Sequence, residues 1–314
     1  MPRPKLLLID GNNMCHRVFW AQRSKGAKGG STLSYKGRAV DVLYGFFRQL
    51  IHLDKKYPDH FRIIAWDRGY ARRLAESQKA VEEGLVPSAY KQPRKEAKEE
   101  KEREGNEDYE SLMEQMEQLQ DALDLVHCLQ VAVDGFEADD IIHTYARLYG
   151  EWDGESVVVS TDKDFYQVID ANTTIYDAMR KEVWSLERFQ LEFGFSPHLW
   201  VDAGAIMGEV GPSKDNIFGV DGWGPKTACQ YVRDYGDIDA IEKALMEKKK
   251  RGKREQTFLD QMPRLRLAKS LKQMDIMPNL PKPRVCRHLS EEGLRKFFLD
   301  WGFASLLKEA RRLV

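Results

Sequence analysis

The chain has 314 residues, 42% hydrophobic and 32% charged with a net charge of −1, the composition of a globular protein long enough for two closely joined units. No apolar run approaches the ~20 residues of a membrane span, and Leu6-Leu7-Leu8-Ile9 is too short for the core of a signal peptide. The four cysteines (Cys15, Cys128, Cys229 and Cys286) show no CxxC spacing, which argues against a zinc site or a disulfide framework and fits a reducing cytoplasm.

Three short apolar runs predict buried strands, and acidic residues stand at the end of each. KLLLID ends at Asp10, FRIIAWD ends at Asp67, and ESVVVSTDKD runs to Asp162 and Asp164. Between the first two runs, residues 39–58 place apolar side chains at helical spacing until a proline stops the pattern. Strands that alternate with helices predict an α/β fold with a mostly parallel central sheet flanked by helices.

The acids at the strand ends are expected to meet at one edge of that sheet, because parallel strands bring their carboxyl ends to the same edge. A single aspartate after a strand is often only a turn residue, but several in this position are harder to explain by turns alone. Oxygen ligands without nearby histidine or cysteine favour Mg²⁺ or Mn²⁺ over zinc. The pattern therefore predicts a divalent-cation site at this edge.

The middle of the chain predicts two helices of different character. Residues 91–110 form a dense mixed-charge stretch, whose Lys95/Glu99 and Glu99/Arg103 pairs at i,i+4 support an exposed helix. This helix is interpreted either as a mobile element over the acidic site or as a solvated connection. From residue 109 to about residue 129, one apolar stripe is typical of a helix that packs on the core.

The sequence GFEADDII places the carboxylates of Glu137, Asp139 and Asp140 at a predicted helix start. Capping and the positive end of the helix dipole account for one or two acids in this position. A third acid indicates a cation, so we expect these side chains to share the metal site of the strand ends.

Two features further along the chain predict phosphate binding. In NIFGVDGWGPKTACQYV, three glycines predict a hairpin followed by a helix that Pro225 opens; they would let backbone N–H groups approach a phosphate, although a tight helical corner needs glycine too. Residues 242–272 hold eleven Lys or Arg against four acids, including the run KKKRGKR. This basic segment is either a phosphate-binding face or a solvated surface, and both interpretations remain open.

In this order, LLLIDGNN, AWD, SAYKQPR, GFEADDII, STDKDFYQVI and DNIFGVDGWGPKTA resemble the motifs of the 5′-nuclease family. These are the flap endonucleases and 5′→3′ exonucleases of phages and bacteria, including the N-terminal domain of DNA polymerase I. The resemblance runs from about Leu6 to about Phe303. It implies a PIN-like nuclease core at residues 1–195 with a helical arch at about 72–110, a helix-hairpin-helix subdomain at 196–275, and a C-terminal segment at 276–314 that packs back on the core.

The resemblance also implies roles for the matching residues. The metal ligands would be Asp10, Asp67, Glu137, Asp139, Asp140, Asp162, Asp164 and Asp215, which would hold two Mg²⁺ ions that Mn²⁺ can replace, with a K⁺ ion at the helix-hairpin-helix. Tyr90 would stack on a nucleobase, while Lys91 and Arg94 would contact the scissile phosphate beside the catalytic acids Asp67 and Asp162. Further DNA contacts are expected from Arg72, Arg73, Gly219, Gly222, Gly224, Lys226, Lys248, Lys249, Lys250 and Arg251.

One motif departs from the family pattern. The family commonly has an Asp after MG, three residues before the Asp of the DN pair, whereas this chain reads MGEVGPSKDN. Glu209 therefore replaces that Asp and stands six residues before Asp215. We expect the extra residues to loop outward, so that Glu209 is a ligand or an outer-shell partner of the second cation. The alternative is that Glu209 points to solvent.

These features predict a structure-specific 5′ nuclease, a flap endonuclease and 5′→3′ exonuclease that hydrolyses DNA in replication or repair. Two cations can activate a water, neutralise the phosphate and stabilise the leaving oxyanion. The expected partner is DNA with a 5′ end, flap or junction, bound by a monomer in the cytoplasm of a bacterium or a phage-infected host, without a membrane. The alternatives are a PIN-like ribonuclease and a non-catalytic protein that binds DNA structures.

Overall fold

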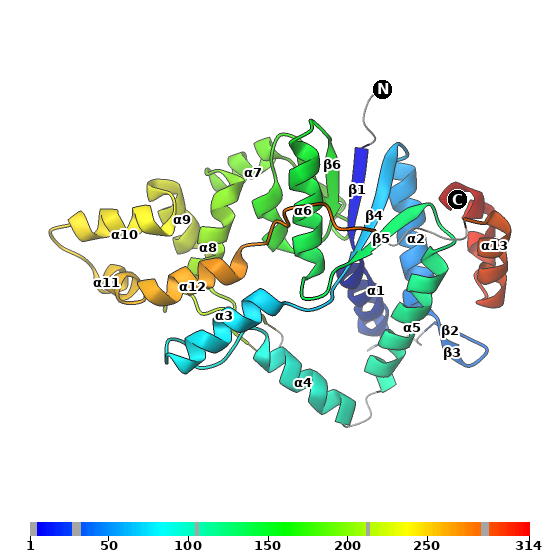
Figure 1. The fold of residues 1–314 in the computed structure, drawn as a ribbon, viewed down its shortest axis with the longest axis horizontal. Coiled ribbons are helices and arrows are strands. Elements are labelled where there is room, and N and C mark those ends of the chain that lie inside the picture. Colours follow the sequence, from blue (N-terminus) through cyan, green and yellow to red (C-terminus); the bar gives the residue numbers. More distant parts are fainter. Residues whose placement is uncertain (1–4, 27–32, 104–106, 212–213, 284–288) are drawn as a thin grey trace.

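The computed structural model describes residues 5–26, 33–103, 107–211, 214–283 and 289–314. Its centre is a six-stranded sheet in the order β5-β4-β1-β6-β7-β8 (Figure 1). The strands β5 (Cys128–Ala132), β4 (His60–Trp66), β1 (Lys5–Asp10), β6 (Ser156–Val159) and β7 (Thr173–Asp177) run parallel, and β8 (Glu182–Trp184) adds an antiparallel edge. The predicted mostly parallel sheet flanked by helices is confirmed.

Both faces of the sheet are buried. Leu6 and Leu8 of β1 pack into one hydrophobic cluster with α6 (Ala138–Gly150), while Leu7 and Ile9 pack into another. The second cluster includes residues of α1 (Gly11–Gly26), α2 (Asp41–Lys56) and α5 (Glu107–Leu123). Because successive strand residues point to opposite faces and both faces are covered, the strands are continuous apolar runs in the sequence. This is why the apolar pattern located β1, β4 and β6.

The apolar stripe of α5 overstates the length of the helix. The helix predicted to run to about Leu129 ends at Leu123, and the chain turns before β5 begins at Cys128. The side chain of Gln130 in β5 connects this strand to the end of α5. Its Nε2 donates to the carbonyl oxygen of Gln120 at 2.8 Å and to Asp124 Oδ1 at 2.9 Å. A five-residue strand with a buried glutamine does not stand out as an apolar run, so periodicity missed it.

A helical extension leaves the core beyond β8. It comprises α7 (Leu186–Phe193), the 3₁₀-helix η2 (Pro197–Leu199), α8 (Trp200–Met207), α9 (Pro225–Tyr235), α10 (Ile238–Glu247), α11 (Lys253–Asp260) and α12 (Met262–Lys272) (Figure 1). The predicted helix opened by Pro225 is α9, whose N-cap is Gly224. None of the helices in these described ranges is long and apolar enough to cross a membrane.

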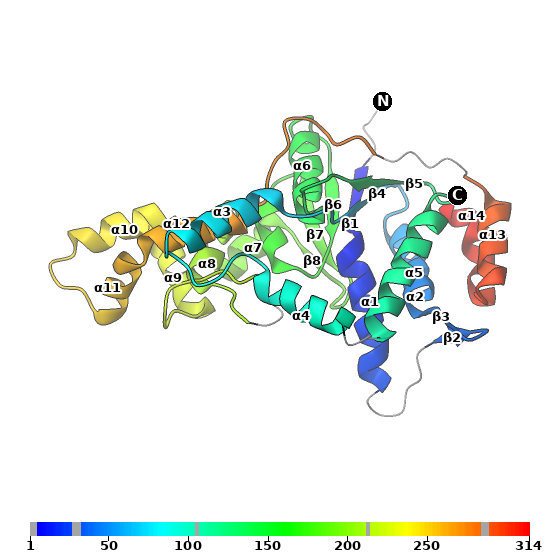
Figure 2. The same ribbon diagram turned by 60° about the horizontal axis from the view of Figure 1, so that its bottom comes forward.

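The segment between β4 and α5 forms two helices with different surroundings. α3 (Ala71–Glu82) lies along α12, where Arg72 and Arg73 donate to backbone carbonyls of that helix (Figure 2). α4 (Gln92–Arg103) then leads toward α5 and carries the predicted Lys95–Glu99 ion pair at 3.8 Å, while the side chain of Arg103 lies outside the described residues. Of the predicted arch, α3 is therefore docked on the extension.

The last helices return to the core. α13 (Glu291–Asp300), η3 (Ala304–Glu309) and α14 (Ala310–Leu313) pack on α2, with the rings of Phe47 and Phe298 at 5.1 Å. The backbone N–H of His127 donates to the carbonyl oxygen of Leu313 at 2.7 Å. Cys15 and Cys229 are free thiols, Cys128 is buried, and Cys286 lies outside the described residues.

The three glycines of the hairpin before α9 serve different purposes. A Cβ on Gly219 would lie 2.4 Å from the carbonyl oxygen of Ile206 and 2.5 Å from the backbone nitrogen of Gly208, so this glycine lets the hairpin press against the end of α8. Gly222 has φ +79°, which favours glycine, and open space around it. Gly224 also faces open space at the helix start. Gly222 and Gly224 therefore leave space for a ligand, whereas Gly219 is needed for close packing.

We predict that Gly219→Ala lowers the free energy of unfolding by about 3 kcal/mol, because the new Cβ meets backbone atoms that cannot move aside. Gly222→Ala should cost only about 1–2 kcal/mol, since it meets no atom and adds left-handed strain alone. Urea denaturation of the two variants and the wild type measures the difference. Equal losses would contradict the packing role of Gly219.

Candidate metal centre and nucleic-acid interface

The three strand-end aspartates stand at the carboxyl ends of adjacent strands. Asp10 ends β1, Asp67 follows β4 and Asp162 lies just after β6. A backbone N–H holds the Oδ1 atom of each: Asn13 donates to Asp10 at 2.9 Å, Ala138 to Asp67 at 2.8 Å, and Asp164 to Asp162 at 2.9 Å. The three carboxylates are thus oriented by the backbone at one edge of the sheet, as predicted from the parallel topology.

These carboxylates repel one another. Burial, followed by the negative charges of Asp67 and Asp162, raises the pKa of Asp10 to about 8. A divalent cation would relieve this repulsion, and carboxylate oxygens are the ligands that Mg²⁺ and Mn²⁺ prefer. The donor set at this edge therefore fits such a cation.

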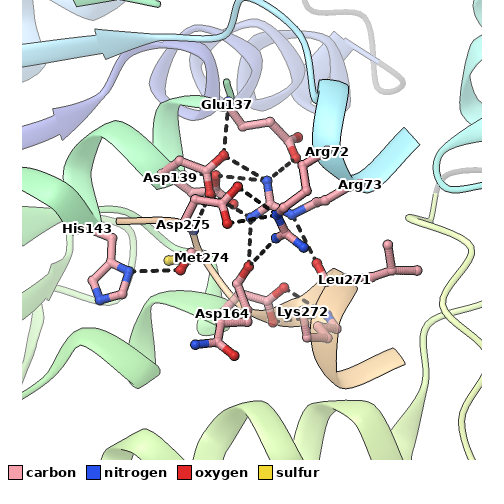
Figure 3. Close-up of polar contacts among 12 residues, drawn as sticks. Arg72, Arg73, Glu137, Asp139, His143, Asp164, Leu271, Lys272, Met274 and Asp275 are labelled. Atoms are coloured by element: carbon pink, nitrogen blue, oxygen red, sulfur yellow. Dashed lines mark hydrogen bonds and ion pairs between the residues drawn. The ribbon is translucent and has the colours of Figure 1, made fainter. Parts of the chain in front are cut away.

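The helix-start acids are neutralised by the protein itself. Oxygen atoms of Glu137, Asp139 and Asp140 lie within 4.8 Å of one another at the start of α6. Arg73 enters this group from α3, its Nη1 donating to Glu137 Oε2 at 2.7 Å and its Nη2 to Asp140 Oδ1 at 2.7 Å (Figure 3). The crowding of these acids is therefore tolerated because a buried guanidinium lies among them.

Asp140 and Asp139 differ in what surrounds them. Asp140 is 1% exposed, and its two oxygens accept from Arg73 and from the backbone N–H of Asp275. The side chain of Asp139 is 29% exposed and lies 3.8 Å from Arg73. Burial and the charge of Glu137 raise the pKa of Asp139, which remains a candidate ligand. The carboxylate of Asp140 is instead committed to holding α3 and α6 together.

The two arginines of α3 pair with other groups of the protein. The Arg73 side chain is 3% exposed, so the predicted DNA contact of Arg73 does not fit this arrangement. Arg72 pairs with Asp275 at 2.7 Å and donates to the carbonyl oxygens of Ser270 and Gln273 (Figure 3). Both side chains hydrogen-bond to backbone carbonyls at the end of α12 and hold it against α3. No local sequence pattern predicts this role.

The SAYKQPR motif forms a second charged group, around Asp215. Arg94 Nη1 donates to Asp215 Oδ1 at 2.6 Å, and Lys91 pairs with Glu137 and lies 3.7 Å from Asp215. Burial alone would raise the pKa of Asp215, but Lys91 and Arg94 outweigh it and hold the pKa below its ordinary value. Lys91 has φ +54°, a strained conformation that its N–H bond to the Asp215 carbonyl helps to hold.

Tyr90 is buried beneath this group. The residue is 4% exposed, its ring packs against that of Tyr70 at 5.5 Å, and it belongs to a small hydrophobic cluster with Ile217 and Leu271. Its hydroxyl oxygen lies 3.2 Å from Glu137 Oε2 and 3.2 Å from Asp215 Oδ2, so its single O–H donates to one of these carboxylates at a time. The predicted stacking of Tyr90 on a nucleobase does not fit, because the ring is packed inside the protein; the side chain instead positions two acids.

A third group joins Asp164 and Glu209 through a lysine that no sequence motif indicated. Lys272 Nζ donates to Asp164 Oδ1 at 3.0 Å, to Asp164 Oδ2 at 2.8 Å and to Glu209 Oε2 at 2.7 Å. Burial raises the pKa of Asp164 to about 6 although Lys272 opposes the rise. At Glu209 burial is outweighed, and the pKa is lowered mainly by Lys272.

The loop that departs from the family pattern is closed by backbone pairing. Glu209 and Ile217 form an antiparallel bridge, with the N–H of Ile217 donating to the Glu209 carbonyl at 3.0 Å. The intervening residues 212–213, in the stretch expected to loop outward, lie outside the described residues. The Glu209 side chain is 27% exposed and also pairs with Lys214, so it does not simply point to solvent.

A cleft of about 990 Å³ joins the acidic edge to the glycine hairpin. Asp162, Asp164 and Glu209 line one part of it, and Gly222 and Trp223 line another. Lys226 is exposed at the start of α9. The acids and the predicted phosphate-binding hairpin therefore share one hollow of the surface.

The basic segment after α10 is only partly available for a ligand. Lys248 pairs with Glu255 at 2.7 Å, and Arg251 donates to the carbonyl oxygens of Leu245 and Met246. These two side chains therefore stabilise the turn. Lys249 and Lys250 are exposed. Of the four predicted DNA contacts in this run, Lys249 and Lys250 are thus the better placed to meet a phosphate.

Comparisons with known proteins agree with this architecture. A family model described as the N-terminal resolvase-like domain of 5′-3′ exonucleases matches residues 5–194, and one described as their C-terminal SAM fold matches residues 195–286. DNA polymerase I of Thermus thermophilus is 28% identical over 320 residues, covering 98% of this chain and 33% of the polymerase. The chain thus spans about a third of the length of that relative.

A second curated relative and two solved structures are similar as well. A 5′-3′ exonuclease of Aquifex aeolicus is 26% identical over 238 residues, covering 76% of this chain and 72% of that protein. Among solved structures, T5 5′-exonuclease with bound zinc shares the fold at a TM-score of 0.66 and 19% identity, covering 98% of this chain and 99% of that one. The catalytic core of Rad2 in complex with DNA matches at a TM-score of 0.56 and 14% identity, covering 99% and 91%.

We predict that Asp140→Asn and Asp139→Asn have different effects on the stability of the metal-free protein. Asp140→Asn weakens a buried ion pair with Arg73 and should cost about 3 kcal/mol or more of unfolding free energy. Asp139→Asn replaces a carboxyl group whose pKa is raised by burial and by the charge of Glu137. The free energy of unfolding should therefore stay the same or rise. Urea denaturation in EDTA at neutral pH tests both. A large loss for Asp139→Asn would contradict the distinction.

Proposed function

The chain belongs to the 5′-3′ exonuclease family, and from this premise we propose that it is a structure-specific 5′ nuclease that cleaves DNA phosphodiesters near 5′ ends, flaps or junctions. One observation carries the proposal: three strand-end carboxylates meet at the sheet edge, and Asp162 lines the same cleft as the hairpin glycines. Part of the candidate metal centre and the candidate phosphate-binding hairpin therefore line the same cleft. We propose a role for the chain in DNA replication or repair on the same basis.

We propose that four aspartates hold one divalent cation, which is Mg²⁺ or, in place of Mg²⁺, Mn²⁺. They are Asp10, Asp67, Asp139 and Asp162. When bound, such a cation would supply Lewis acidity toward the phosphate and lower the pKa of a coordinated water. Ala138 supports this grouping, because its backbone N–H holds Asp67 and so ties the start of α6 to the end of β4. The Asp10 pKa, raised by burial and by neighbouring acids, is the electrostatic reason for placing the cation here.

Lys91 and Arg94 are proposed to bind the scissile phosphate. The positive charge of Lys91 lowers the pKa of Asp10, so the ammonium lies within electrostatic range of the proposed metal centre. Glu137 and Asp215 hold the two basic groups in place, and Tyr90 in turn orients both acids. Fixed positive charge at this position would stabilise the charge that develops on the phosphate in the transition state.

The hairpin and the exposed lysines are proposed to bind the rest of the DNA. Gly222 and Gly224 leave open space at the N-terminus of α9, where backbone N–H groups and the helix dipole attract a phosphate. Lys226, Lys249 and Lys250 are exposed and would contact the backbone without reading sequence. A K⁺ ion at this hairpin, a monomeric state and a cytoplasmic location stay predictions.

The two alternatives fit less well. A PIN-like ribonuclease usually lacks a helix-hairpin-helix, whereas this chain carries a glycine hairpin that opens α9. A non-catalytic binding protein has no need for carboxylates that repel one another at the sheet edge, yet Asp10, Asp67 and Asp162 are all in place. Repulsion of this kind is costly unless a cation is bound.

We predict that the protein cleaves a 5′-labelled DNA flap in Mg²⁺ but not in EDTA, and that Asp162→Ala abolishes cleavage. Binding of the flap in Ca²⁺ should stay within several-fold of wild type, because an acid attracts DNA only through a metal. Asp59→Ala, at an exposed turn before the other end of β4, is the matched control and should cleave normally. Product mapping on flap, nicked duplex, single strand and an RNA flap completes the test.

Each outcome separates the candidates. Cleavage by Asp162→Ala at the wild-type rate would remove Asp162 from the metal centre. Cleavage restricted to the RNA flap would favour the ribonuclease, and tight flap binding without cleavage in any metal would favour the non-catalytic protein.

We further predict that Lys249→Ala combined with Lys250→Ala weakens binding of duplex DNA and flattens its salt dependence. Removal of one lysine–phosphate pair should reduce the slope of log K against log salt by about 1. Fluorescence anisotropy from low to moderate salt measures the slope. Lys5→Ala removes the same kind of charge at the start of β1, at the opposite edge of the sheet from the acids, and should leave the slope unchanged. An unchanged slope in the double variant would make the basic segment a solvated surface.

A further inference from the structure

The ammonium of Lys272 lies where the family resemblance places ligands of a second cation. Its Nζ is within 3.0 Å of both oxygens of Asp164 and 2.7 Å from Glu209 Oε2. A lysine ammonium has three N–H donors, and three carboxylate oxygens accept them here. The hydrogen-bonding capacity of the group is therefore filled by the acids that were expected to bind metal.

The end of α12 is built to hold this lysine in place. Arg72 donates to the carbonyl oxygen of Ser270, Arg73 to that of Leu271, and Gln167 to that of Lys272 itself. The Lys272 stem passes over α8 at Gly204, where a Cβ would lie 3.6 Å from its Cδ. Only 7% of the Lys272 side chain is exposed. Withdrawing the ammonium would leave it buried without its partners, which is strongly unfavourable.

The remaining acid of the expected second site is also occupied. Asp215 accepts from Arg94 and Tyr90 and lies beside Lys91, in a group separate from the Lys272 contacts. Each of the three acids, Asp164, Glu209 and Asp215, therefore already has a cationic partner from the protein. In contrast, the carboxylate of Asp10 accepts from the backbone N–H of Asn13, and no lysine or arginine of the described residues lies at hydrogen-bonding distance from it. The residues of the second site do not fit an added divalent cation.

We propose that the Lys272 ammonium takes the place of the second divalent cation, so that this chain holds one divalent cation, at the Asp10, Asp67, Asp139 and Asp162 group. The inference rests on the proposed function, since it assumes that this group binds metal. Lys272 is then a positioning residue: it neutralises Asp164 and Glu209 and fixes the wall of the cleft that both line. A permanent cation built into the fold needs no metal supply at that position.

The test is the number of Mn²⁺ ions bound by the metal-free full chain, measured by electron paramagnetic resonance of free Mn²⁺ and by isothermal titration calorimetry. The wild type should bind one ion per chain in the sub-millimolar range. Lys272→Met keeps the stem and removes the charge, so it should expose Asp164 and Glu209 and bind two. Lys269→Met is the matched control on the same helix, because Lys269 pairs with Asp202 and not with these acids; it should bind one.

A second variant keeps the proposal testable if Lys272→Met does not fold. In the double variant Asp164→Asn, Glu209→Gln, the amide oxygens still accept from Lys272, and binding should remain at one Mn²⁺ ion. Two ions in the wild type that fall to one in the double variant would overturn the role of Lys272 and leave the proposed metal centre standing. No bound ion in the wild type would overturn the proposed metal centre, and the inference with it. Lys272→Met that folds and still binds one ion would also overturn the inference.

Discussion

The buried guanidinium of Arg73 is the interaction on which the site depends. It donates to Glu137 and Asp140 at the start of α6 and to the carbonyl oxygens of Leu271 and Gln273 at the end of α12. One side chain on the docked helix α3 therefore joins the start of α6, where the acidic motif lies, to the last residues of α12. Three acids can crowd one helix start only while this charge is present, because an unpaired buried charge costs several kcal/mol. The same contact places Lys272 beside Asp164.

The acids fall into two classes once the cations of the protein are assigned. Glu137 and Asp140 share Arg73, Asp215 lies between Lys91 and Arg94, and Asp164 and Glu209 share Lys272. The strand-end acids Asp10, Asp67 and Asp162 are instead held by backbone N–H groups, which orient a carboxylate without neutralising it. Negative charge left at a buried edge is where an added cation binds most favourably. At the proposed metal centre, an added cation would therefore be directed to the strand-end acids, because the protein's own cations pair with the others.

The sequence was sufficient for the features that local pattern controls. Runs buried on both faces predicted β1, β4 and β6, and parallel pairing then brought Asp10, Asp67 and Asp162 to one edge. It was insufficient where a contact joins distant segments: Lys272 and Asp164 are 108 positions apart, and a lysine in a segment with eleven basic residues carries no mark of burial. The burial of Tyr90 was missed for the same reason, since it depends on Ile217 and Leu271. The roles of individual site residues, which were taken from the motifs, remain predictions. The fold class could be predicted from the apolar runs without those roles.

The Arg94–Asp215 ion pair is partly open to solvent. The Arg94 side chain is 48% exposed although it pairs with Asp215 at 2.6 Å, and exposed pairs of this kind contribute little net stability. A phosphodiester also carries one negative charge and offers Arg94 two non-bridging oxygens, so exchange of Asp215 for phosphate costs little. Lys91 differs, because its side chain is 16% exposed and held by Glu137 as well as Asp215. A bound phosphate would therefore draw Arg94, and the start of α4 with it, toward the substrate while Lys91 stays fixed beside Asp10.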